Sequence, residues 1–325
     1  MFRATIVENF PLRRHGLQGN YLIQVQIGQD VICRPGQFFK FDLTEQLDKE
    51  KLKIVEAKND HSVLQIKNLS SSNDFMTRQP LLARPYSVGL CENTGKQTPI
   101  TFLYKILGPG SKRLSDLNVG QTLTILGPLG GNSFYLPKKK KCALMVAGGV
   151  GLPPLLFLSR QLLLLSEGIS SVHLFVGANT SDKLPLHADF AIGKNIKNVK
   201  GLPAIFQHLA DPRMTIQIST DDGSEGHRGL ATELLEQYLK KNDGEQESVI
   251  YTCGPWRMMA RTAAIAGEHH LPCQVSLEEM MGCGIGACQG CATKIKSGNA
   301  KGWEYKLVCR DGPVFDANDV YWDKE

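Results

Sequence analysis

The segment Cys142-Ala-Leu-Met-Val-Ala-Gly-Gly-Val-Gly-Leu-Pro-Pro154 decides the fold class of this 325-residue chain. Residues 142–147 are uniformly apolar, which is typical of a strand buried on both faces. The glycines within residues 148–151 allow a tight turn, and the apolar run 152–165 predicts a buried helix. A strand, a glycine turn and a helix in this order open a unit of alternating strands and helices.

Three further apolar segments extend this unit toward the C-terminus. Residues 172–176, 215–219 and 248–252 have strand patterns, and helical patterns alternate with them. Such alternation predicts a doubly wound parallel sheet with helices on both faces. We therefore expect an α/β domain over residues 138–272.

The N-terminal part of the chain has a different pattern. Residues 21–27 and 100–106 are short alternating segments, and turn signals such as Arg34-Pro-Gly36 separate segments of this kind. Several short strands at this spacing predict an antiparallel β-barrel over residues 1–137. The polar stretch 43–74 is interpreted as a surface excursion from that barrel.

Four of the nine cysteines gather near the C-terminus. Cys283, Cys288 and Cys291 are followed by Cys309, which is the Cys-x4-Cys-x2-Cys spacing of plant-type two-iron, two-sulfur clusters with a distant fourth ligand. Glycines between them let the backbone approach the sulfurs. A zinc site is the main alternative, but zinc motifs usually combine Cys-x2-Cys pairs or histidines. We expect a small iron–sulfur domain over residues 273–325.

Two segments of the predicted barrel suit a flavin dinucleotide. Arg84-Pro-Tyr-Ser87 offers a guanidinium for a pyrophosphate, an aromatic face for the flavin ring and a hydroxyl for its nitrogens. The pattern of residues 104–114 places Gly110 and Ser111 at the start of a short helix, where anions bind. Two unrelated turns are the alternative explanation.

The order of these motifs resembles the ferredoxin–NADP reductase superfamily. The motifs are Arg-Pro-Tyr-Ser at 84–87, Gly-x-Gly-Ser-x-x-Leu at 108–114, Leu-Gly-Pro-Leu-Gly at 126–130, Gly-Gly-Val-Gly at 148–151 and Cys-Gly-Pro at 253–255. The resemblance implies a multidomain chain in which an antiparallel barrel binds FAD and an α/β domain binds a nicotinamide nucleotide. It also implies that Cys253 lies beside the nicotinamide.

Within that superfamily, the chain resembles the electron-transfer subunits of NAD-dependent dihydroorotate dehydrogenase. The resemblance rests on residues 281–291 and 308–315, and on Asp-Asp-Gly-Ser at 221–224 followed by residues 226–229. The chain departs from that pattern at Tyr86, at Ser111 and in extra residues around 43–74 and 181–213. An FMN-binding barrel of about 250 residues does not fit beside three domains in this chain.

The resemblance also implies a partner and a direction for the chemistry. The partner would be an FMN-containing dihydroorotate dehydrogenase subunit, in a heterotetramer of two copies of each chain. Electrons would run from dihydroorotate through that FMN, the cluster and FAD to NAD, in pyrimidine biosynthesis.

The expected cofactor contacts follow from the motifs and the resemblance. The expected FAD contacts are Arg84, Pro85, Tyr86, Ser87, Leu103, Tyr104, Lys105, Gly110 and Ser111. The expected nicotinamide contacts are Gly149, Gly151, Cys253 and Gly254. The expected iron ligands are Cys283, Cys288, Cys291 and Cys309. NAD is favoured over NADP because residues 177–182 contain no Arg for a 2′-phosphate. For the glycines at 148–151, tight packing between strand and helix is the alternative explanation.

Two other functions stay open. A diaphorase subunit of another iron–sulfur complex (hydrogenase, sulfite reductase or ferredoxin reductase type) would share these domains, and the Cys-Arg-Asp-Gly-Pro-Val-Phe segment at 309–315 modestly favours dihydroorotate dehydrogenase. A non-catalytic assembly or regulatory subunit would keep its cofactors only as structure. Rapid flavin reduction by NADH would rule out that third function.

Composition and charge disfavour other partners. The formal net charge of +5 is spread along the chain, and the run Lys138-Lys-Lys-Lys141 lacks aromatic or Arg-rich support, so we expect no nucleic-acid partner. No window holds about 20 apolar residues, so we expect no membrane span. The N-terminal residues lack the apolar core of a signal peptide, and the odd number of cysteines disfavours a disulfide framework. The expected compartment is the cytoplasm.

Overall fold

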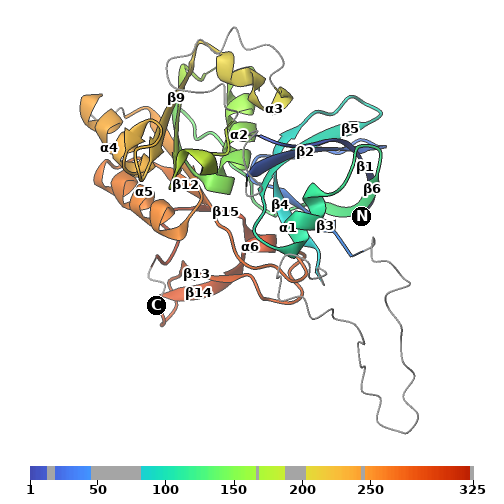
Figure 1. Cartoon of the computed structure of the whole chain (residues 1–325). Coiled ribbons are helices and arrows are strands. Elements are labelled where there is room, and N and C mark those ends of the chain that lie inside the picture. The colour runs from blue at the N-terminus through green and yellow to red at the C-terminus, as the bar shows by residue number, and fades with distance from the viewer. Residues whose placement is uncertain (13–18, 45–81, 166–167, 187–202, 243–245, 323–325) are drawn as a thin grey trace.

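The chain forms a closed barrel, an open sheet covered by helices and a C-terminal loop region that lies beside both (Figure 1). The structure is a computed structural model that describes residues 1–12, 19–44, 82–165, 168–186, 203–242 and 246–322. Most of the extra segment expected at 43–74, and part of the one expected at 181–213, lie outside these residues. No helix of the described residues has the length and apolar character needed to cross a bilayer.

Six antiparallel strands close into the predicted barrel in the order β1-β2-β5-β4-β3-β6. Neighbouring residues of a strand point to opposite faces, so alternation decides which side chains face inward. On β3, Phe39 and Phe41 pack against Phe102 in the barrel interior, whereas Phe38 packs in a core outside the barrel. The elements are β1 (Phe2–Pro11), β2 (Asn20–Ile27), β3 (Phe38–Asp42), β4 (Arg84–Cys91), β5 (Thr98–Lys105), α1 (Pro109–Ser115) and β6 (Thr122–Leu129).

The open sheet has seven strands in the order β10-β9-β8-β7-β11-β12-β15. β7 pairs in parallel with β8 and β11, and β15 pairs antiparallel with β12 at one edge. The chain continues from β7 first to one side and then to the other, which is the predicted doubly wound order and puts a ligand crevice at the carboxyl ends of β7 and β11. The strands are β7 (Cys142–Gly148), β8 (Ser171–Ala178), β9 (Met214–Thr220), β10 (His227–Arg228), β11 (Ser248–Cys253), β12 (Cys273–Ser276) and β15 (Val314–Asp316).

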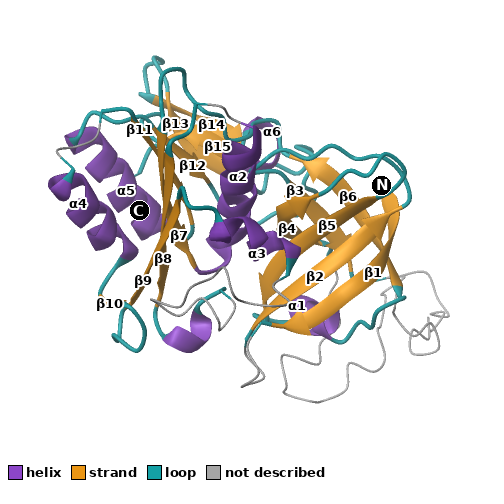
Figure 2. Cartoon of the chain, turned by 90° about the horizontal axis from the view of Figure 1, so that it is seen from above, coloured by secondary structure: helices purple, strands orange, loops and turns teal. Residues whose placement is uncertain are grey.

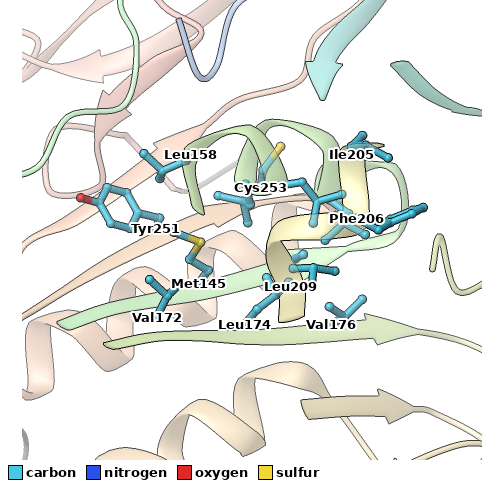
Figure 3. Packing of buried hydrophobic residues seen from close by; sticks show 14 of the residues in the cluster. Met145, Leu158, Val172, Leu174, Val176, Ile205, Phe206, Leu209, Tyr251 and Cys253 are labelled. Atoms are coloured by element: carbon cyan, nitrogen blue, oxygen red, sulfur yellow. The ribbon is translucent and has the colours of Figure 1, made fainter. Parts of the chain in front are cut away.

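Helices cover both faces of the sheet (Figure 2). α2 and α3 lie on the face toward the barrel, and α4 and α5 lie on the opposite face. Each face of the sheet has a hydrophobic core, and β7 contributes to both: Met145 packs in the first core, on the α2 side, and Leu144 packs in the second, on the opposite side. Figure 3 shows the first core, in which Met145 lies near Tyr251 and Cys253. The helices are η3 (Gly149–Gly151), α2 (Leu152–Leu165), η4 (Ser181–Lys183), α3 (Ala204–Gln207), η7 (His208–Ala210), α4 (Ala231–Lys241) and α5 (Trp256–Glu268).

The barrel and the sheet are packed directly against each other. Gly89 of β4 lies so close to α3 that a Cβ at this position would stand 2.5 Å from Cδ1 of Ile205. Asn20 of β2 also donates from Nδ2 to the carbonyl oxygen of Lys183 at 3.1 Å. These contacts hold the barrel against the sheet.

The C-terminal region leaves the sheet after β12 and returns to it at β15. Between them lie the cysteine loop, a two-stranded hairpin and a short helix, which are β13 (Ala292–Lys296), β14 (Trp303–Leu307) and α6 (Val308–Asp311). β12 begins at Cys273, where we expected the iron–sulfur domain to begin, and it pairs in parallel with β11. The cysteine region is therefore attached to the sheet at both of its ends.

Candidate redox site

The four C-terminal cysteines lie together as two pairs. In the first pair, the amide of Cys283 donates to Sγ of Cys288 at 3.4 Å, and the amide of Cys288 donates to Sγ of Cys283 at 3.3 Å. In the second pair, the amide of Cys309 donates to Sγ of Cys291 at 3.5 Å. The amide of Gly286 links the two pairs, because it donates to Sγ of Cys309 at 3.2 Å. The structure thus brings together all four cysteines that the spacing selected.

The paired arrangement fits a two-iron cluster better than a single zinc ion. Each iron of such a cluster takes two of the four protein ligands, so the thiolates arrive as two pairs. A structural zinc ion instead needs ligands that converge on one point.

The backbone of the cysteine loop supports thiolates. Gly284 and Gly286 have φ of +80° and +84°, which glycine adopts at little steric cost. The amide of Ile285 donates to Sγ of Cys283 at 3.4 Å, and the amide of Gly286 donates to Sγ of Cys309 at 3.2 Å. The amides of Cys288 and Ile285 lower the pKa of the Cys283 thiol to about 6. Burial, followed by the hydrogen bond with Cys291, raises the pKa of the Cys309 thiol to about 11. Iron would deprotonate such a thiol on binding, as coordinated metals do.

The turn that carries Cys309 packs against the end of the barrel. A Cβ on Gly131 would stand 2.1 Å from the carbonyl oxygen of Arg310, so only glycine fits there. Asn132 adds a hydrogen bond from Nδ2 to the carbonyl oxygen of Asp311 at 2.7 Å. The fourth cysteine is therefore positioned by the barrel as well as by its own loop.

A cavity of about 230 Å³ opens between the barrel, the sheet and the cysteine loop. Val150, from the glycine turn of the sheet, lines it, and so do Glu278 and Met281, which come just before Cys283. Most of the expected flavin contacts line its barrel side. These are Pro85, Tyr86, Ser87, Leu103, Tyr104 and Lys105. A ring bound in this cavity would lie between the nucleotide crevice and the cysteine loop.

Aromatic side chains form the barrel wall of the cavity. The rings of Tyr86 and Tyr104 meet edge to face, with centroids 5.9 Å apart. The Tyr104 hydroxyl donates to Oδ1 of Asn9 at 2.9 Å, which fixes its ring. Burial raises the pKa of both phenols above their usual value, so they stay neutral at physiological pH.

The structure brings Arg84 and Gly110 together outside this cavity. A Cβ on Gly110 would lie 3.2 Å from Cγ of Arg84, so the arginine stem passes directly over the glycine. Ser111 is engaged differently from our expectation of a hydroxyl aimed at a ligand. Its hydroxyl accepts the amides of Leu107 at 2.8 Å and Gly108 at 3.2 Å, and so it closes the turn before α1. A direct Ser111 contact with FAD stays a prediction.

The glycines expected at the nicotinamide site meet backbone to backbone. A Cβ on Gly151 would stand 2.2 Å from the carbonyl oxygen of Cys253 and 2.6 Å from the amide nitrogen of Gly254. Gly254 has φ of +147°, and a Cβ on it would lie 2.8 Å from the nitrogen of Gly148. Gly149 has φ of +51° and free space around its Cβ position. The turns after β7 and β11 are thus pressed together at the crevice.

Cys253 itself is buried behind the cavity. Its side chain is 1% exposed, and it packs in the core shown in Figure 3. Its Sγ lies 4.0 Å from Oε1 of Glu278, a residue that lines the cavity. Burial raises the pKa of both the Cys253 thiol and the Glu278 carboxyl.

The cavity is also lined by residues that were not among the expected cofactor contacts. These are Gly36, Phe38, Leu107, Ser276, Leu277, Glu278, Glu279, Met281 and Pro313. The one available signal was position, because residues 276–281 directly precede the first cysteine of the cluster motif.

Comparison with known proteins supports this organisation. A family model described as the iron-sulfur cluster binding domain of dihydroorotate dehydrogenase B matches residues 278–321. A second, described as an oxidoreductase NAD-binding domain, matches residues 145–264. Among solved structures, an NADH-dependent reduced ferredoxin-NADP oxidoreductase is similar with a TM-score of 0.66 at 21% identity, covering 98% of this chain and 89% of that chain. A ferredoxin reductase of carbazole 1,9a-dioxygenase is similar with a TM-score of 0.57 at 18% identity, covering 83% of this chain and 66% of that chain.

The fold and the matched domains define an oxidoreductase of the ferredoxin reductase fold, with an NAD-binding domain and an iron–sulfur domain. The electron transfer subunit of dihydroorotate dehydrogenase B (NAD(+)) from Caldanaerobacter subterraneus subsp. tengcongensis is 36% identical over 239 residues, covering 74% of this chain and 81% of that protein. The same subunit from Bacillus cereus is 33% identical over 244 residues, with the same coverage. The chain belongs to the family of dihydroorotate dehydrogenase B (NAD(+)) electron transfer subunits.

Proposed function

We propose that this chain passes electrons from the FMN of a dihydroorotate dehydrogenase partner through its own iron–sulfur cluster and FAD to NAD⁺, in pyrimidine biosynthesis. The position of the cavity of about 230 Å³ carries the proposal, because Tyr86, Val150 and Met281 bring the barrel, the nucleotide turn and the cysteine loop to one place. When bound, the flavin supplies the step between one-electron and two-electron chemistry.

Three regions of the chain divide this work. Residues 1–137 hold FAD, residues 138–272 hold NAD, and residues 273–325 hold the cluster through Cys283, Cys288, Cys291 and Cys309. β12 and β15 make the third region part of the sheet, which keeps the cysteine loop at a constant distance from the cavity. A rigid separation matters because each cofactor must be held at a fixed position relative to the next.

The barrel residues orient the flavin. Tyr86 offers its ring to the isoalloxazine, and Ser87 offers a hydroxyl at the cavity wall. Arg84 is exposed at the start of β4 and stands over Gly110, where a pyrophosphate can receive its guanidinium.

Arg84→Ala is expected to weaken FAD retention by roughly 10-fold or more, because a charge-assisted hydrogen bond to phosphate contributes about 1.5–3 kcal/mol. Gel filtration followed by measurement of the bound FAD per chain checks this result. Arg261→Ala is the control, since Arg261 is also exposed but lies on α5, on the face of the sheet opposite the barrel. Equal FAD retention in the two variants would contradict the assignment of Arg84.

The end of β9 favours NAD over NADP. Asp221 and Asp222 follow Thr220, and Asn179 donates from Nδ2 to Oδ2 of Asp221 at 2.8 Å. Hydrogen bonds from Ser224 hold the pKa of Asp222 below its usual value, so this carboxyl is ionised. Two carboxylates repel a 2′-phosphate more than the single Arg228 of β10 attracts it.

We therefore expect kcat/KM for NADH to exceed that for NADPH by about tenfold or more, since like-charge contacts cost about 1 kcal/mol or more even in water. Steady-state oxidation of both nucleotides with ferricyanide as acceptor measures the ratio. Asp222→Asn should lower the ratio of the two kcat/KM values, whereas Asp116→Asn, directly after α1, should leave the ratio unchanged. A wild-type preference for NADPH would be the opposite of the expected result.

The partner and the compartment are parts of the same proposal. The membership of the chain in an electron transfer subunit family supports a catalytic partner subunit, and a heterotetramer of two copies of each chain is the assembly that we propose. None of the nine cysteines, all of which lie among the described residues, forms a disulfide, which supports a reducing compartment such as the cytoplasm.

An anaerobic reconstitution tests the function. The chain is loaded with iron, sulfide and FAD, and its visible spectrum is followed after addition of NADH or dihydroorotate, with and without a co-expressed FMN subunit. We expect NADH to bleach flavin and cluster in the chain alone, and dihydroorotate to do so only with the partner. Response to NADH but not to dihydroorotate in the complex would assign the chain to another iron–sulfur complex. No response to NADH would refute the electron-transfer function itself.

A further inference from the structure

Lys40 is a buried cation to which the proposed function gives no task. The residue is 4% exposed, and it lies on β3 between Phe39 and Phe41, whose rings fill the barrel interior. Lys40 therefore projects from the outer face of the barrel, as Phe38 does two residues earlier. Phe38 lines the cavity proposed for the flavin. On the same face of β3, Phe38 thus points to the cavity and Lys40 points to the cysteine loop, which lies beside β3 (Figure 1).

The side chain of Lys40 contacts the loop on both sides of Cys283. Its Nζ donates to the carbonyl oxygen of Gly282, the residue before this cysteine. Its stem lies against Gly284, the residue after it, where a Cβ would stand 2.5 Å from Cδ of Lys40. Gly284 is therefore needed for the lysine to reach this position, in addition to its φ of +80°.

The Lys40 ammonium has no carboxylate partner in the part of the chain that the structure describes. The nearest acidic residue in sequence, Asp42, instead accepts the amide of Thr44 at 2.9 Å and its hydroxyl at 2.6 Å on Oδ1. A buried charge without a counter-charge is strongly destabilising. A two-iron cluster with four thiolates carries a net charge of about −2 when oxidised and about −3 after reduction by one electron. The negative charge of such a cluster would balance the positive charge of Lys40.

We propose that Lys40 is the internal counter-ion of the iron–sulfur cluster and raises its reduction potential. The inference rests on the proposed ligation of the cluster by Cys283 and the other three cysteines. Reduction adds one electron and breaks no bond, so the fixed positive charge stabilises the reduced form more than the oxidised form. Lys40 is a positioning and tuning residue that links the flavin barrel to the cluster.

Arg310 provides an internal comparison. It follows the ligand Cys309 in sequence, but it is exposed, and Nε lies 2.9 Å from Oδ1 of Asp311. Solvent and this carboxylate offset its charge, so its effect on the cluster should be small although it is next to a ligand.

The test is a potentiometric titration of the cluster, followed by electron paramagnetic resonance, in the full chain reconstituted with iron, sulfide and FAD. At the wild-type midpoint potential, Lys40→Met should lower the ratio of reduced to oxidised cluster about tenfold, which is 59 mV for a one-electron couple. Lys40→Arg keeps a charge and should shift the ratio less than about twofold. Arg310→Gln should also shift it less than about twofold.

Lys40→Gln keeps a hydrogen-bond donor but removes the charge, so it distinguishes the effect of the charge from that of the hydrogen bond. It should shift the ratio as Lys40→Met does. If both neutral variants fail to hold iron and sulfide while Lys40→Arg holds them, the counter-ion role stands. If Lys40→Met keeps the wild-type ratio, or if Lys40→Arg behaves as Lys40→Met does, the lysine is only a structural contact and the inference is wrong. A wild-type chain that binds no cluster at all would overturn the proposed cysteine site and this inference together.

Discussion

Cys288→Ala should abolish the cluster and stop electron entry from dihydroorotate, while NADH oxidation by the flavin continues. Cys288 is exposed, so removing its thiol costs little folding energy. Its partner Cys283 would then lack the second thiolate of its pair. We expect the visible absorption of the cluster to disappear and the dihydroorotate-to-NAD⁺ rate of the complex to fall at least about 100-fold.

Two assays, dihydroorotate-to-NAD⁺ transfer and NADH oxidation by ferricyanide, separate loss of the cluster from loss of flavin activity. NADH oxidation with ferricyanide needs only the barrel and the sheet in our proposal, so it should stay within about twofold of the wild-type rate. Cys91→Ser is the matched control, because Cys91 is a half-buried free thiol whose Sγ lies 3.6 Å from the carbonyl oxygen of Val31, far from the loop. A Cys288→Ala chain that keeps the spectrum of the cluster would show that the iron ligands lie elsewhere.

Gly151→Ala should disable the nicotinamide site. The added Cβ would lie 2.2 Å from the carbonyl oxygen and 2.4 Å from the carbonyl carbon of Cys253, and such backbone atoms cannot turn away as a side chain can. The turns after β7 and β11 must then separate. We expect KM for NADH to rise about tenfold or more, and the free energy of unfolding to fall by about 1–3 kcal/mol.

A second glycine provides the control for this substitution. Gly267 lies in α5, and no atom beyond its chain neighbours and the backbone of its own helix is within 4 Å of its Cβ position, so Gly267→Ala adds a methyl group without a clash. It should raise the free energy of unfolding by about 0.5–1 kcal/mol and leave KM for NADH unchanged. Urea unfolding and NADH-dependent ferricyanide reduction measure both quantities. An unchanged KM in Gly151→Ala would mean that the nicotinamide does not bind at this pair of turns.

The features that local sequence determined are those whose physical basis is itself local. The spacing of Cys283, Cys288 and Cys291 is set by the reach of one loop around a small group of atoms, and the structure brings them together with Cys309. The barrel and the doubly wound sheet followed from periods of alternation and from the glycine turn, because these patterns reflect burial of one face or two. The segments at 84–87 and 103–105, expected to contact FAD, line the cavity apart from Arg84, and their contact with FAD stays a prediction.

Other features depend on which distant segments meet, and only the tertiary structure decided them. β12, which begins at Cys273, pairs in parallel with β11 and so belongs to the sheet. Glu278 reaches the cavity beside Cys253, and the hydroxyl of Ser111 turns back to its own backbone. Lys40 and Gly282 are 242 positions apart, and no pattern around either residue indicates the other. Sequence periodicity reports whether a face is buried, but packing alone determines which neighbour covers it and which charges are left to be balanced.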